Sequence, residues 1–598
     1  MCGIAGIITP YAKNYTENIQ KMTNAIAHRG PDGSAHEFFE NAAFGHRRLS
    51  IIDLSETGKQ PMFSDTKKEC IVLNGEIYGY KDLKKKYTDY SYQGTSDTEV
   101  ILAMYQKKGK DLLHELPGMF AFAIWDDTKQ ELFCARDRFG EKPFYYAAGK
   151  NGEFVFASEI KAILASGLVD PEVSDEALYH YLQYGYVSTY QSIYSNICIL
   201  PPAHQLTFSA GKISVNRYYS IPKTDQKISL GEAKENFTHL LKNAVSKQLV
   251  ADVEVGSFLS GGLDSSTIVA MVNEFKPKQT TISFGYSGET SELKYADEIA
   301  EKYHTNHIEI YENRGNISSE ILKISPFFDE PFADMSYTPQ YKICEAAARH
   351  LKVVLSGDAG DELFGGYDFY SVESKLKNHF SYNNILVKFG LKQFGKFRET
   401  SYITKESISH KNIFDFHLNR VRNYFSPKEI ASLGIQSRYH QEYSFNINPD
   451  SLNDMMRIDL EKYVPGNMLV KSDRMAMANS LEVRTPFLDK DFAEFCIQLP
   501  ENLKLDGERD KIILRENMQN YWTENIKKRT KQGFGASVEN WFEEKSLNDL
   551  SDVLLKDQTQ RVFNLIDFNA AQKFLKKDKK HWNLLQLAIW ADNNRKYI

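Results

Sequence analysis

The first residues of the chain could supply a nucleophile. The sequence begins MCGIAGI, so a cysteine directly follows the initiator methionine and a glycine follows the cysteine. Removal of Met1, which a small second side chain favours, leaves Cys2 with both a thiol and a free α-amine. These groups titrate at about 8.5 and about 8, so the amine can accept the thiol proton without a histidine. An accidental terminal cysteine is the alternative interpretation, and the rest of the sequence must decide between the two.

A glycine-containing loop could bind a phosphate group. The segment SGGLDSS (260–266) follows the apolar stretch VGSFL and precedes a helical pattern. In open α/β sheets ligands bind at the carboxyl ends of strands, and a helix N-terminus presents unpaired N–H groups to an anion. Serine hydroxyls add donors, and no lysine completes a Walker A motif. The loop therefore suits pyrophosphate, although a plain turn in which Asp264 and Ser265 cap the helix explains it equally well.

Acidic residues in and near this loop indicate a divalent cation. Asp264 would repel a phosphate unless a cation such as Mg²⁺ lay between them. A second loop, SGDAGDELFGGY (356–367), follows the apolar stretch KVVLS and holds Asp358, Asp361 and Glu362 among four glycines. If both loops end strands of one sheet, these acids could complete the metal shell that Asp264 starts. Helix capping and turn formation explain one such acid more easily than three.

The elements that must hold these residues form two halves with different patterns. Up to about residue 205, four short apolar stretches separated by turn residues predict a β-meander. Helical patterns near 19–27 and at 97–109 interrupt the strands. This half is therefore predicted to be an α+β layered domain. The four stretches are 118–127, 129–137, 142–149 and 153–158.

After a polar connection at 220–230, predicted strands and helices alternate. An amphipathic helix at 237–249 precedes the strand VGSFL, and further strands are predicted at TISF, HIEIY and KVVLS with helices between them. This order predicts a parallel, doubly wound sheet. Beyond Gly366 the chain is predicted to be mainly helical.

The composition is that of an ordinary globular protein. With 598 residues the chain is too long for one hydrophobic core, so two or more domains are expected. A formal net charge of −6 gives no general attraction to nucleic acid or to an anionic membrane, and no apolar run is long enough to span a bilayer. We expect a cytoplasmic protein. The six cysteines form no CxxC pair, so the five beyond Cys2 are expected to fill core space.

Eight motifs, in this order along the chain, resemble those of glutamine-dependent asparagine synthetases: MCGIAG, HRGPDG, HRRLSIID, LNGEIYGY, TSDTEV, SGGLDSS, SGDAGDE and LEVRTPFLD. The resemblance covers nearly the whole chain. It implies an α+β N-terminal nucleophile glutaminase domain with αββα layers at 1–210. It also implies, at 211–598, an α/β doubly wound pyrophosphate-loop ATPase domain of the asparagine synthetase type with a helical C-terminal part. In the implied reaction ATP adenylates the aspartate side chain, and ammonia released from glutamine displaces AMP.

For the first domain the resemblance implies a glutamine site. Cys2 looks like the nucleophile that releases ammonia through a thioester, and Asn74 and Gly75 look like the oxyanion hole. An arginine can bind the carboxylate of glutamine, and acids can bind its amine. The residues implied to hold glutamine are Arg48, Leu49, Ser50, Ile51, Ile52, Asn74, Gly75, Glu76 and Asp97.

For the second domain the resemblance implies an ATP site with Mg²⁺. Asp264 and Asp361 look like the metal ligands. Lys511 is similar to the lysine that neutralises charge on the leaving pyrophosphate, and a helix-surface lysine is the alternative for this residue. The residues implied to contact ATP are Leu259, Ser260, Gly261, Gly262, Asp264, Ser265, Ser266, Phe284, Ser356 and Gly357, with Asp358, Asp361 and Glu362 in the second acidic loop.

Some positions depart from the family pattern. Gly79 stands where an asparagine is usual, and Asp358 and Ala359 stand where glutamate or aspartate followed by glycine is more common. Asp358 has one methylene fewer than glutamate with which to reach a ligand. The segment DGERDK lacks the glycine-lysine pair commonly seen before Lys511.

Three functions remain open from the sequence. The first is asparagine synthesis from aspartate, ATP and glutamine, with ammonia crossing an internal, largely apolar tunnel. The second is amidation of another carboxylate, such as a sugar uronate in surface-polysaccharide assembly. RTKQGFG (529–535) also occurs in relatives with that role, and the aromatic, basic stretch 375–398 could serve a larger acceptor, with helical packing as its alternative. The third is a catalytically silent binding or regulatory protein, against which the intact site residues argue. We expect small-molecule partners, no nucleic acid and no membrane, and we leave a homodimer open.

Overall fold

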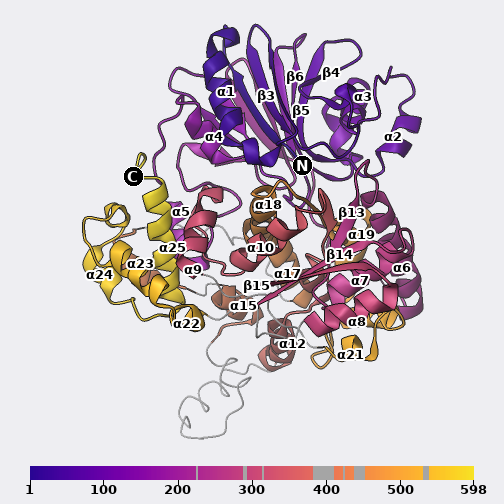
Figure 1. The fold of residues 1–598 in the computed structure, drawn as a ribbon, viewed down its shortest axis with the longest axis vertical. Coiled ribbons are helices and arrows are strands. Elements are labelled where there is room, and N and C mark those ends of the chain that lie inside the picture. Colours follow the sequence, from indigo (N-terminus) through magenta and orange to yellow (C-terminus); the bar gives the residue numbers. More distant parts are fainter. Residues whose placement is uncertain are drawn as a thin grey trace, which may run out of the picture.

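The computed structural model describes residues 1–223, 227–286, 293–312, 316–381, 410–421, 424–436, 451–529 and 538–598. The beginning of the chain builds a β-rich part, which is stacked on a larger part in which helices surround a parallel sheet (Figure 1). The N-terminus lies where these two parts meet.

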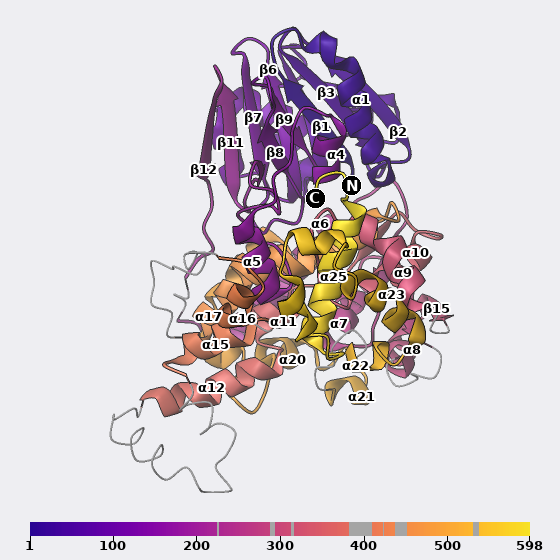
Figure 2. The same ribbon diagram turned by 90° about the vertical axis from the view of Figure 1, so that its left-hand side faces the viewer.

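Two six-stranded antiparallel sheets face each other in the N-terminal part (Figure 2). Their facing side chains, among them Phe44, Val72 and Trp125, form one apolar cluster. Helix α1 (Thr16–Ala25) packs on the first sheet and α3 (Thr98–Lys108) on the second, so the layers run helix, sheet, sheet, helix, as the resemblance implies. The first sheet has the order β10 (Ile197–Ile199), β8 (Tyr145–Ala148), β9 (Phe154–Ala157), β1 (Gly3–Ile8), β3 (Ala42–Arg48), β2 (Gly33–Phe38). The second has the order β12 (Lys212–Arg217), β11 (His204–Ser209), β7 (Glu131–Arg136), β6 (Met119–Asp126), β5 (Glu69–Glu76), β4 (Met62–Phe63).

The hairpins predicted from the sequence form, but they do not make one meander. Strand β6 pairs with β7 in the second sheet, whereas β8 pairs with β9 in the first. The prediction of a continuous meander is therefore wrong. A local turn specifies each hairpin, but the sheet that the hairpin joins depends on a distant partner, here β1 for β9.

The hairpin β11–β12 crosses residue 210, where the sequence places the domain boundary, because β12 ends only at Arg217. We propose that the boundary lies in the connection between Arg217 and helix α6 (Leu230–Gln248).

The C-terminal part contains a five-stranded parallel sheet, as the alternation of strands and helices predicts. Strand β13 (Val255–Phe258) comes first in the sequence. The next two strands of this sheet lie on one side of it, and the last two lie on the other side. Such a reversal creates a crevice at the carboxyl ends of the strands, where α/β sheets bind ligands. The sequence does not predict the short last strand, which lies in the motif LEVRTPFLD. The order is β15 (Asn306–Glu312), β14 (Thr280–Tyr286), β13 (Val255–Phe258), β16 (Val353–Leu355), β17 (Glu482–Arg484).

Helices cover both faces of this sheet. On one face lie α6, α7 (Leu263–Asn273) and α19 (Lys490–Gln498), and on the other α10 (Tyr337–Ala347) and α18 (Leu469–Met477). In the described ranges, the remaining α-helices and the π-helix are α2 (Tyr80–Lys86), α4 (Ile160–Ala165), α5 (Asp175–Tyr184), α8 (Leu293–Tyr303), α9 (Ile317–Ile324), α11 (Gly360–Phe364), α12 (Asp368–Ser381), α15 (Ile413–Val421), α16 (Pro427–Ser432), α17 (Leu452–Ile458), the π-helix η6 (Asp459–Met468), α20 (Ile512–Met518), α21 (Glu524–Lys527), α22 (Val538–Trp541), α23 (Lys545–Leu555), α24 (Phe568–Gln572) and α25 (Lys579–Asn593).

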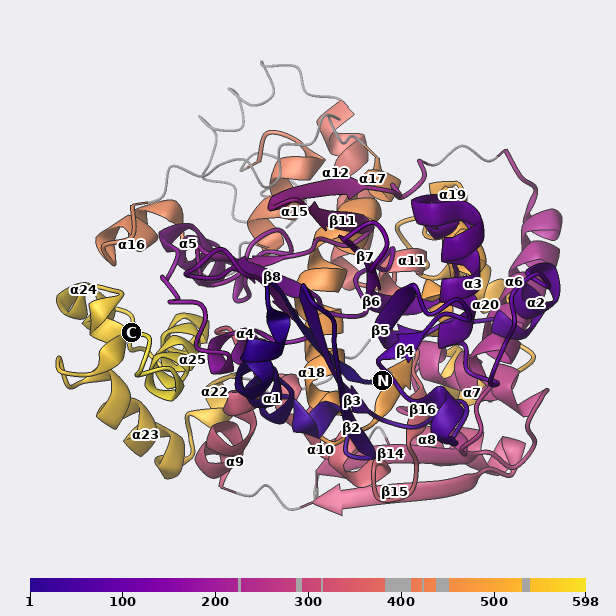
Figure 3. The same cartoon turned by 90° about the horizontal axis from the view of Figure 1, so that it is seen from above.

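Helix α5 joins the two parts, because it belongs to the first part of the chain but packs beside the C-terminal helix α25 (Figures 2 and 3). The hydroxyl of Tyr181 donates a hydrogen bond to the carbonyl oxygen of Asn583 at 2.8 Å. One apolar cluster runs from β1 through α5 to α25. The interface between the two parts is therefore continuous with a hydrophobic core.

The structure also describes the cysteines, the lengths of the helices and part of the aromatic, basic stretch 375–398. Four of the five cysteines beyond Cys2 are buried, and Cys198 is half-buried. Among the described residues, every helix is too short or too polar to cross a membrane. Of the stretch 375–398, residues up to 381 belong to α12, and the rest lies outside the described residues, as does RTKQGFG apart from Arg529.

Candidate active sites

Cys2 lies against residues that the motifs HRRLSIID and LNGEIYGY supply. Its amide N–H donates a hydrogen bond to Asn74 Oδ1 at 3.1 Å, and its Sγ lies 3.9 Å from the carbonyl oxygen of Leu49. Asn74 is fully buried, and its Nδ2 has no hydrogen-bond partner among the described residues. A Cβ on Gly75 would lie 2.1 Å from the carbonyl oxygen of Met119, so only glycine fits there. Asn74 therefore presents an unused donor beside Cys2, as an oxyanion hole requires.

The ammonium group of Met1 lies in the interface between the two parts of the chain. It pairs with Glu482 of β17, and Met1 is only 1% exposed. While Met1 is attached, the nitrogen of Cys2 is an amide and cannot accept a proton. Burial also raises the pKa of the Cys2 thiol, which keeps the thiol protonated. Removal of Met1 is therefore needed before Cys2 can act as a nucleophile with its own base.

The segment 48–52, predicted to hold glutamine, begins with the last residue of strand β3. The guanidinium group of Arg48 donates to the backbone carbonyl oxygens of Asp53 and Ser55, so in this structure it is engaged by the turn after the segment. Leu49 and Ile51 are buried, and Ser50 and Ile52 are half-buried. The structure brings Leu49 into contact with Cys2, and the hydrogen bonds of Arg48 to the turn use only two of its five N–H donors.

Two predicted acids lie near an arginine that comes from the other domain. Arg484 Nη2 is 3.6 Å from Glu76 Oε2, and its Nε is 2.6 Å from Glu482 Oε1. Burial and the neighbouring Glu482 raise the pKa of Glu76. Burial also raises the pKa of Asp97, whose Oδ2 accepts a hydrogen bond from the Ile77 N–H at 2.8 Å. An ammonium group bound here would stabilise both acids in their charged form.

Arg29 belongs to this site, and the sequence prediction missed it. Its Nε donates to the carbonyl oxygen of Cys2 at 3.1 Å, and its Nη1 and Nη2 donate to the two carboxylate oxygens of Asp473 on α18 at 2.8 and 3.0 Å. Nη1 also donates to Glu159 at 2.8 Å, and Arg29 is fully buried. This arginine therefore connects the backbone of Cys2 to the second domain. The sequence feature that could have identified Arg29 is the motif HRGPDG, which contains this residue.

A cavity of about 540 Å³ lies at the carboxyl ends of β13 and β16, and both predicted loops line it. The loops pack closely, because a Cβ on Gly357 or Gly360 would lie 2.9 or 2.6 Å from Asp264. The predicted residues that line the cavity are Ser260, Gly262, Asp264, Ser265, Ser356, Gly357, Asp358, Asp361, Glu362 and Lys511. Four others do not line it, namely Leu259, Gly261, Ser266 and Phe284.

Two carboxylates that line the cavity pair with the same lysine. Lys511 Nζ lies 2.7 and 2.5 Å from the two carboxylate oxygens of Asp264 and 2.7 Å from Asp361 Oδ1. Burial by itself would lower the pKa of Lys511, but the two neighbouring carboxylates raise it, so the lysine is charged. Because Asp264 and Asp361 already converge on one positive group, and carboxylate oxygens are what Mg²⁺ prefers, the two residues fit a magnesium ion.

Two residues other than glycine that line the cavity have a left-handed backbone, one in the second acidic loop and one directly before helix α20. The φ angle is +70° at Ala359, one of the positions that departs from the family pattern, and +48° at Lys511. Each costs about 1–2 kcal/mol for a residue with a Cβ atom. Such strain clusters at functional sites, which agrees with the position of both residues at the cavity.

The other acids of the second loop are engaged differently. Asp358 Oδ2 accepts a hydrogen bond from the hydroxyl of Ser472 at 3.3 Å, and Glu362 Oε1 accepts one from the hydroxyl of Tyr367 at 2.8 Å. Burial, followed by the charge of Asp361, raises the pKa of Glu362 to about 8. The hydrogen bond from Tyr367 holds the Glu362 carboxyl group beside Asp361.

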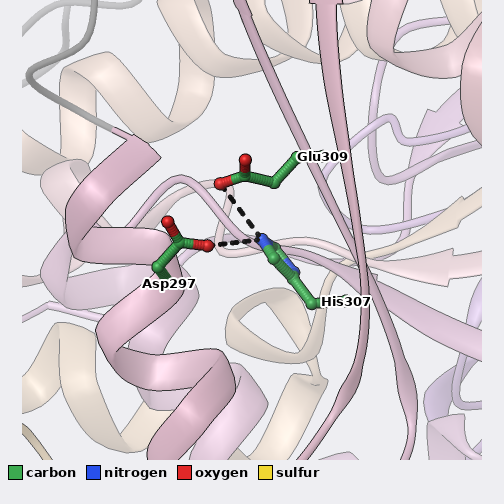
Figure 4. A group of neighbouring side chains, drawn as sticks. All are labelled: Asp297, His307 and Glu309. Carbon is green, nitrogen blue, oxygen red and sulfur yellow. Dashed lines mark ion pairs between the residues drawn. The ribbon is translucent and has the colours of Figure 1, made fainter.

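A separate group of metal-ligand types lies on α8 and β15 (Figure 4). His307 Nε2 points toward Asp297 Oδ1 at 3.8 Å and Glu309 Oε1 at 3.9 Å, and its Nδ1 is hydrogen-bonded with Thr281 Oγ1 at 2.8 Å. A tetrahedral site with metal bonds of about 2.0 Å needs ligand atoms roughly 3.3 Å apart. Asp297 is also 49% exposed. We therefore assign no metal ion to this group.

Comparisons with known proteins match both parts of the chain. The family model described as asparagine synthase matches residues 236–592, and the one described as glutamine amidotransferase domain matches residues 1–219. The chain is 31% identical to "Asparagine synthetase [glutamine-hydrolyzing] 1" of Bacillus subtilis (strain 168), over 99% of this chain and 97% of that protein. It is 40% identical to "Putative asparagine synthetase [glutamine-hydrolyzing] 2" of Methanocaldococcus jannaschii, over 61% of this chain and 76% of that protein. The chain therefore belongs to the asparagine synthase family and carries a glutamine amidotransferase domain in front of the synthase domain.

Proposed function

We propose that this protein is a glutamine-hydrolysing asparagine synthetase. The proposal depends on one observation. The same chain has a cysteine beside a buried amide donor that finds no partner among the described residues, and a cavity that the loops 260–266 and 356–367 both line. The overall reaction converts aspartate, ATP and glutamine into asparagine, AMP, pyrophosphate and glutamate. Both domain matches and the names of the relatives support this assignment.

The first site would release ammonia from glutamine. After removal of Met1, the amine of Cys2 takes the proton of the thiol, and Sγ attacks the side-chain amide carbon of glutamine. Asn74 Nδ2 and the backbone at Gly75 would stabilise the oxyanion. The carbon–nitrogen bond breaks, ammonia leaves with a proton, and water hydrolyses the thioester to glutamate. Arg48 would bind the carboxylate of glutamine, and Glu76 and Asp97 its ammonium group.

The second site would activate and amidate aspartate. A side-chain oxygen of aspartate attacks the α-phosphorus of ATP, and pyrophosphate leaves, which gives β-aspartyl-AMP. Ammonia then attacks the acyl carbon, and AMP leaves with the former carboxylate oxygen. The loop 260–266 and residues Ser356 and Gly357 would bind ATP, and Lys511 would neutralise charge on the leaving pyrophosphate.

Asp264 and Asp361 would hold Mg²⁺ at this site. When bound, the ion would neutralise the phosphate oxygens that the two carboxylates would otherwise repel. Lys511 pairs with the same two carboxylates, so it would supply a second positive charge where we propose that the phosphates bind. We also propose that the enzyme works in the cytoplasm, where ATP and glutamine are available and Cys2 stays reduced.

An acceptor panel tests this proposal. The protein with Met1 removed is incubated with ATP, Mg²⁺, glutamine and one carboxylate at a time, and AMP and the amide product are quantified. Aspartate should give AMP and asparagine in equal amounts, with a KM in the range of about 1 μM to 1 mM. AMP release with a sugar uronate or its nucleotide, and none with aspartate, would replace the asparagine assignment by the polysaccharide one. No AMP with any acceptor, and no glutamate from glutamine, would favour a catalytically silent protein.

A further inference from the structure

A lysine–aspartate pair lines the cavity in a region that the nucleotide and metal assignments do not use. Lys471 Nζ lies 3.2 Å from Asp334 Oδ2 and donates a hydrogen bond to the hydroxyl oxygen of Ser336 at 2.5 Å. Asp334 in turn accepts from the N–H of Ser336 at 2.9 Å and from its hydroxyl at 2.6 Å. The side chains of Lys471 and Asp334 are 15% and 20% exposed. All three residues line the cavity, so the pair faces a ligand space and is not a surface ion pair.

The pair offers one charge of each sign to a bound molecule. The pKa of Asp334 is held below its usual range, because Lys471 and Ser336 together outweigh the effect of burial. An ammonium group and a carboxylate lying side by side are complementary to a zwitterionic α-amino acid, whose carboxylate would bind Lys471 and whose ammonium would bind Asp334. A sugar uronate has no ammonium group to meet Asp334.

The pair lies in the same cavity as the proposed ATP site. Lys471 and Ser472 are neighbours on α18, with Cα atoms about 3.8 Å apart. Ser472 donates to Asp358, which follows directly on Ser356 and Gly357 in the proposed ATP site. Helix α18 therefore contributes one residue to the pair and the next residue to a contact with the second acidic loop.

We propose that Lys471 and Asp334 form the acceptor subsite, which recognises the α-carboxylate and the α-ammonium group of aspartate and thereby sets the substrate class. The inference rests on the proposed function and adds to it the residues that choose the acceptor. Neither residue belongs to a motif that carries the family resemblance, and both are specificity-determining rather than catalytic.

Two acceptor analogues test the two contacts separately. Succinate is aspartate without the ammonium group, and β-alanine is aspartate without the α-carboxylate. AMP release is measured with ammonium chloride as the nitrogen donor, so that the glutamine site takes no part. The variants are Asp334→Asn and Lys471→Met in the full-length protein, with Lys471→Arg as the conservative variant. Lys323→Met is the matched control, since it removes an exposed ion pair of the same kind, with Glu345 on α10.

We expect Asp334→Asn and Lys471→Met each to raise the KM for aspartate about 10- to 150-fold, the effect of losing a hydrogen bond between charged groups. The KM for ATP and the hydrolysis of glutamine should not change. The ratio of kcat/KM for aspartate to kcat/KM for succinate should fall only in Asp334→Asn. The ratio of kcat/KM for aspartate to kcat/KM for β-alanine should fall only in Lys471→Met. Lys471→Arg should recover most of the affinity for aspartate.

Unchanged preference ratios in both variants would overturn the subsite, provided that the wild-type protein adenylates aspartate. If the wild-type protein releases no AMP with aspartate, the proposed function fails first and the subsite fails with it. A parallel rise of the KM for ATP and loss of glutamine hydrolysis would show general damage to the fold. The preference ratios of the milder Asp334→Asn and Lys471→Arg variants would then decide the question.

Discussion

Two nitrogen atoms determine what the N-terminal site can do. The nitrogen of Cys2 is an amide until Met1 is removed, and Nδ2 of Asn74 is a buried donor that finds no partner among the described residues. An unpaired buried donor costs about 1–3 kcal/mol, which binding of an oxyanion would recover. We infer that this cost is retained because the donor is used during the reaction.

Replacement of Cys2 tests the division of labour between the two sites. We predict that Cys2→Ala lowers glutamine hydrolysis at least about 10³-fold, since it removes the nucleophile, and leaves ammonia-dependent synthesis within a factor of two. Glutamate and AMP are measured in separate assays. Cys198→Ala is the control, because this half-buried thiol lies on β10 and should change neither rate. Equal loss of both activities in Cys2→Ala would argue against two independent sites.

Replacement of the paired carboxylates tests the metal assignment. We predict that Asp264→Asn and Asp361→Asn each lower ammonia-dependent synthesis about 10²-fold or more, because each would weaken binding of the Mg²⁺ that we propose shields the phosphates. Glutamine hydrolysis should continue. The Mg²⁺ concentration at half-maximal synthesis should rise in both variants but not in Asp552→Asn, which alters an exposed acid on α23. An unchanged requirement for Mg²⁺ in both would remove the assignment.

At the scale of elements, helix α18 connects the two sites through three consecutive residues. Lys471 faces Asp334 in the cavity, and Ser472 donates to the second acidic loop. Asp473 binds Arg29, which donates to the carbonyl oxygen of Cys2. A shift of this helix would therefore change contacts at both sites.

A buried histidine holds three helical elements together and gives the protein a measurable pH dependence. His417 of α15 contacts Glu373 of α12 at 2.8 Å and Asp459 of η6 at 3.2 Å, and Arg420 lies 4.0 Å from Asp459. Burial alone would lower the pKa of His417, but the two carboxylates raise it to about 9 from 6.5. The folded state therefore binds the proton more tightly than the unfolded state does.

We predict that this histidine stabilises the fold fully below about pH 6.5, and that its contribution, about 3 kcal/mol, is lost as the pH rises to about 9. The free energy of unfolding is measured by denaturant titration at several pH values. In His417→Gln the decline over this interval should be smaller. An identical decline in wild type and variant would show that His417 is not the group responsible.

The local elements were largely predictable, because turns and hydrophobic periodicity are local signals. The helix predicted at 97–109 appears as α3, and the strands VGSFL, TISF, HIEIY and KVVLS form the parallel sheet. The split of the predicted meander between two sheets was not predictable from its turns, because it depends on pairing with β1. Strand β17 was missed because its three residues are too short to show a period.

At the scale of the whole molecule, two buried ion pairs between the domains join residues more than 400 positions apart. Met1 pairs with Glu482, and Arg29 with Asp473. Met1, Arg29 and Glu482 lie in motifs that carry the resemblance, whereas Asp473 does not. Nothing in the spacing of the motifs shows which residues meet. Lys471 and Asp334 belong to no such motif, so only the folded structure indicates that they share a cavity with the loop 260–266.

The central claim is that nitrogen released beside Cys2 reaches an acceptor activated in the cavity of the same chain. The most direct test supplies the protein with aspartate, ATP, Mg²⁺, glutamine labelled with ¹⁵N in its side-chain amide, and a large excess of unlabelled ammonium. We predict that most of the asparagine formed carries ¹⁵N in its amide despite the excess, and that Cys2→Ala forms only unlabelled asparagine. Asparagine labelled only in proportion to free ammonium, or no asparagine at all, would contradict the account.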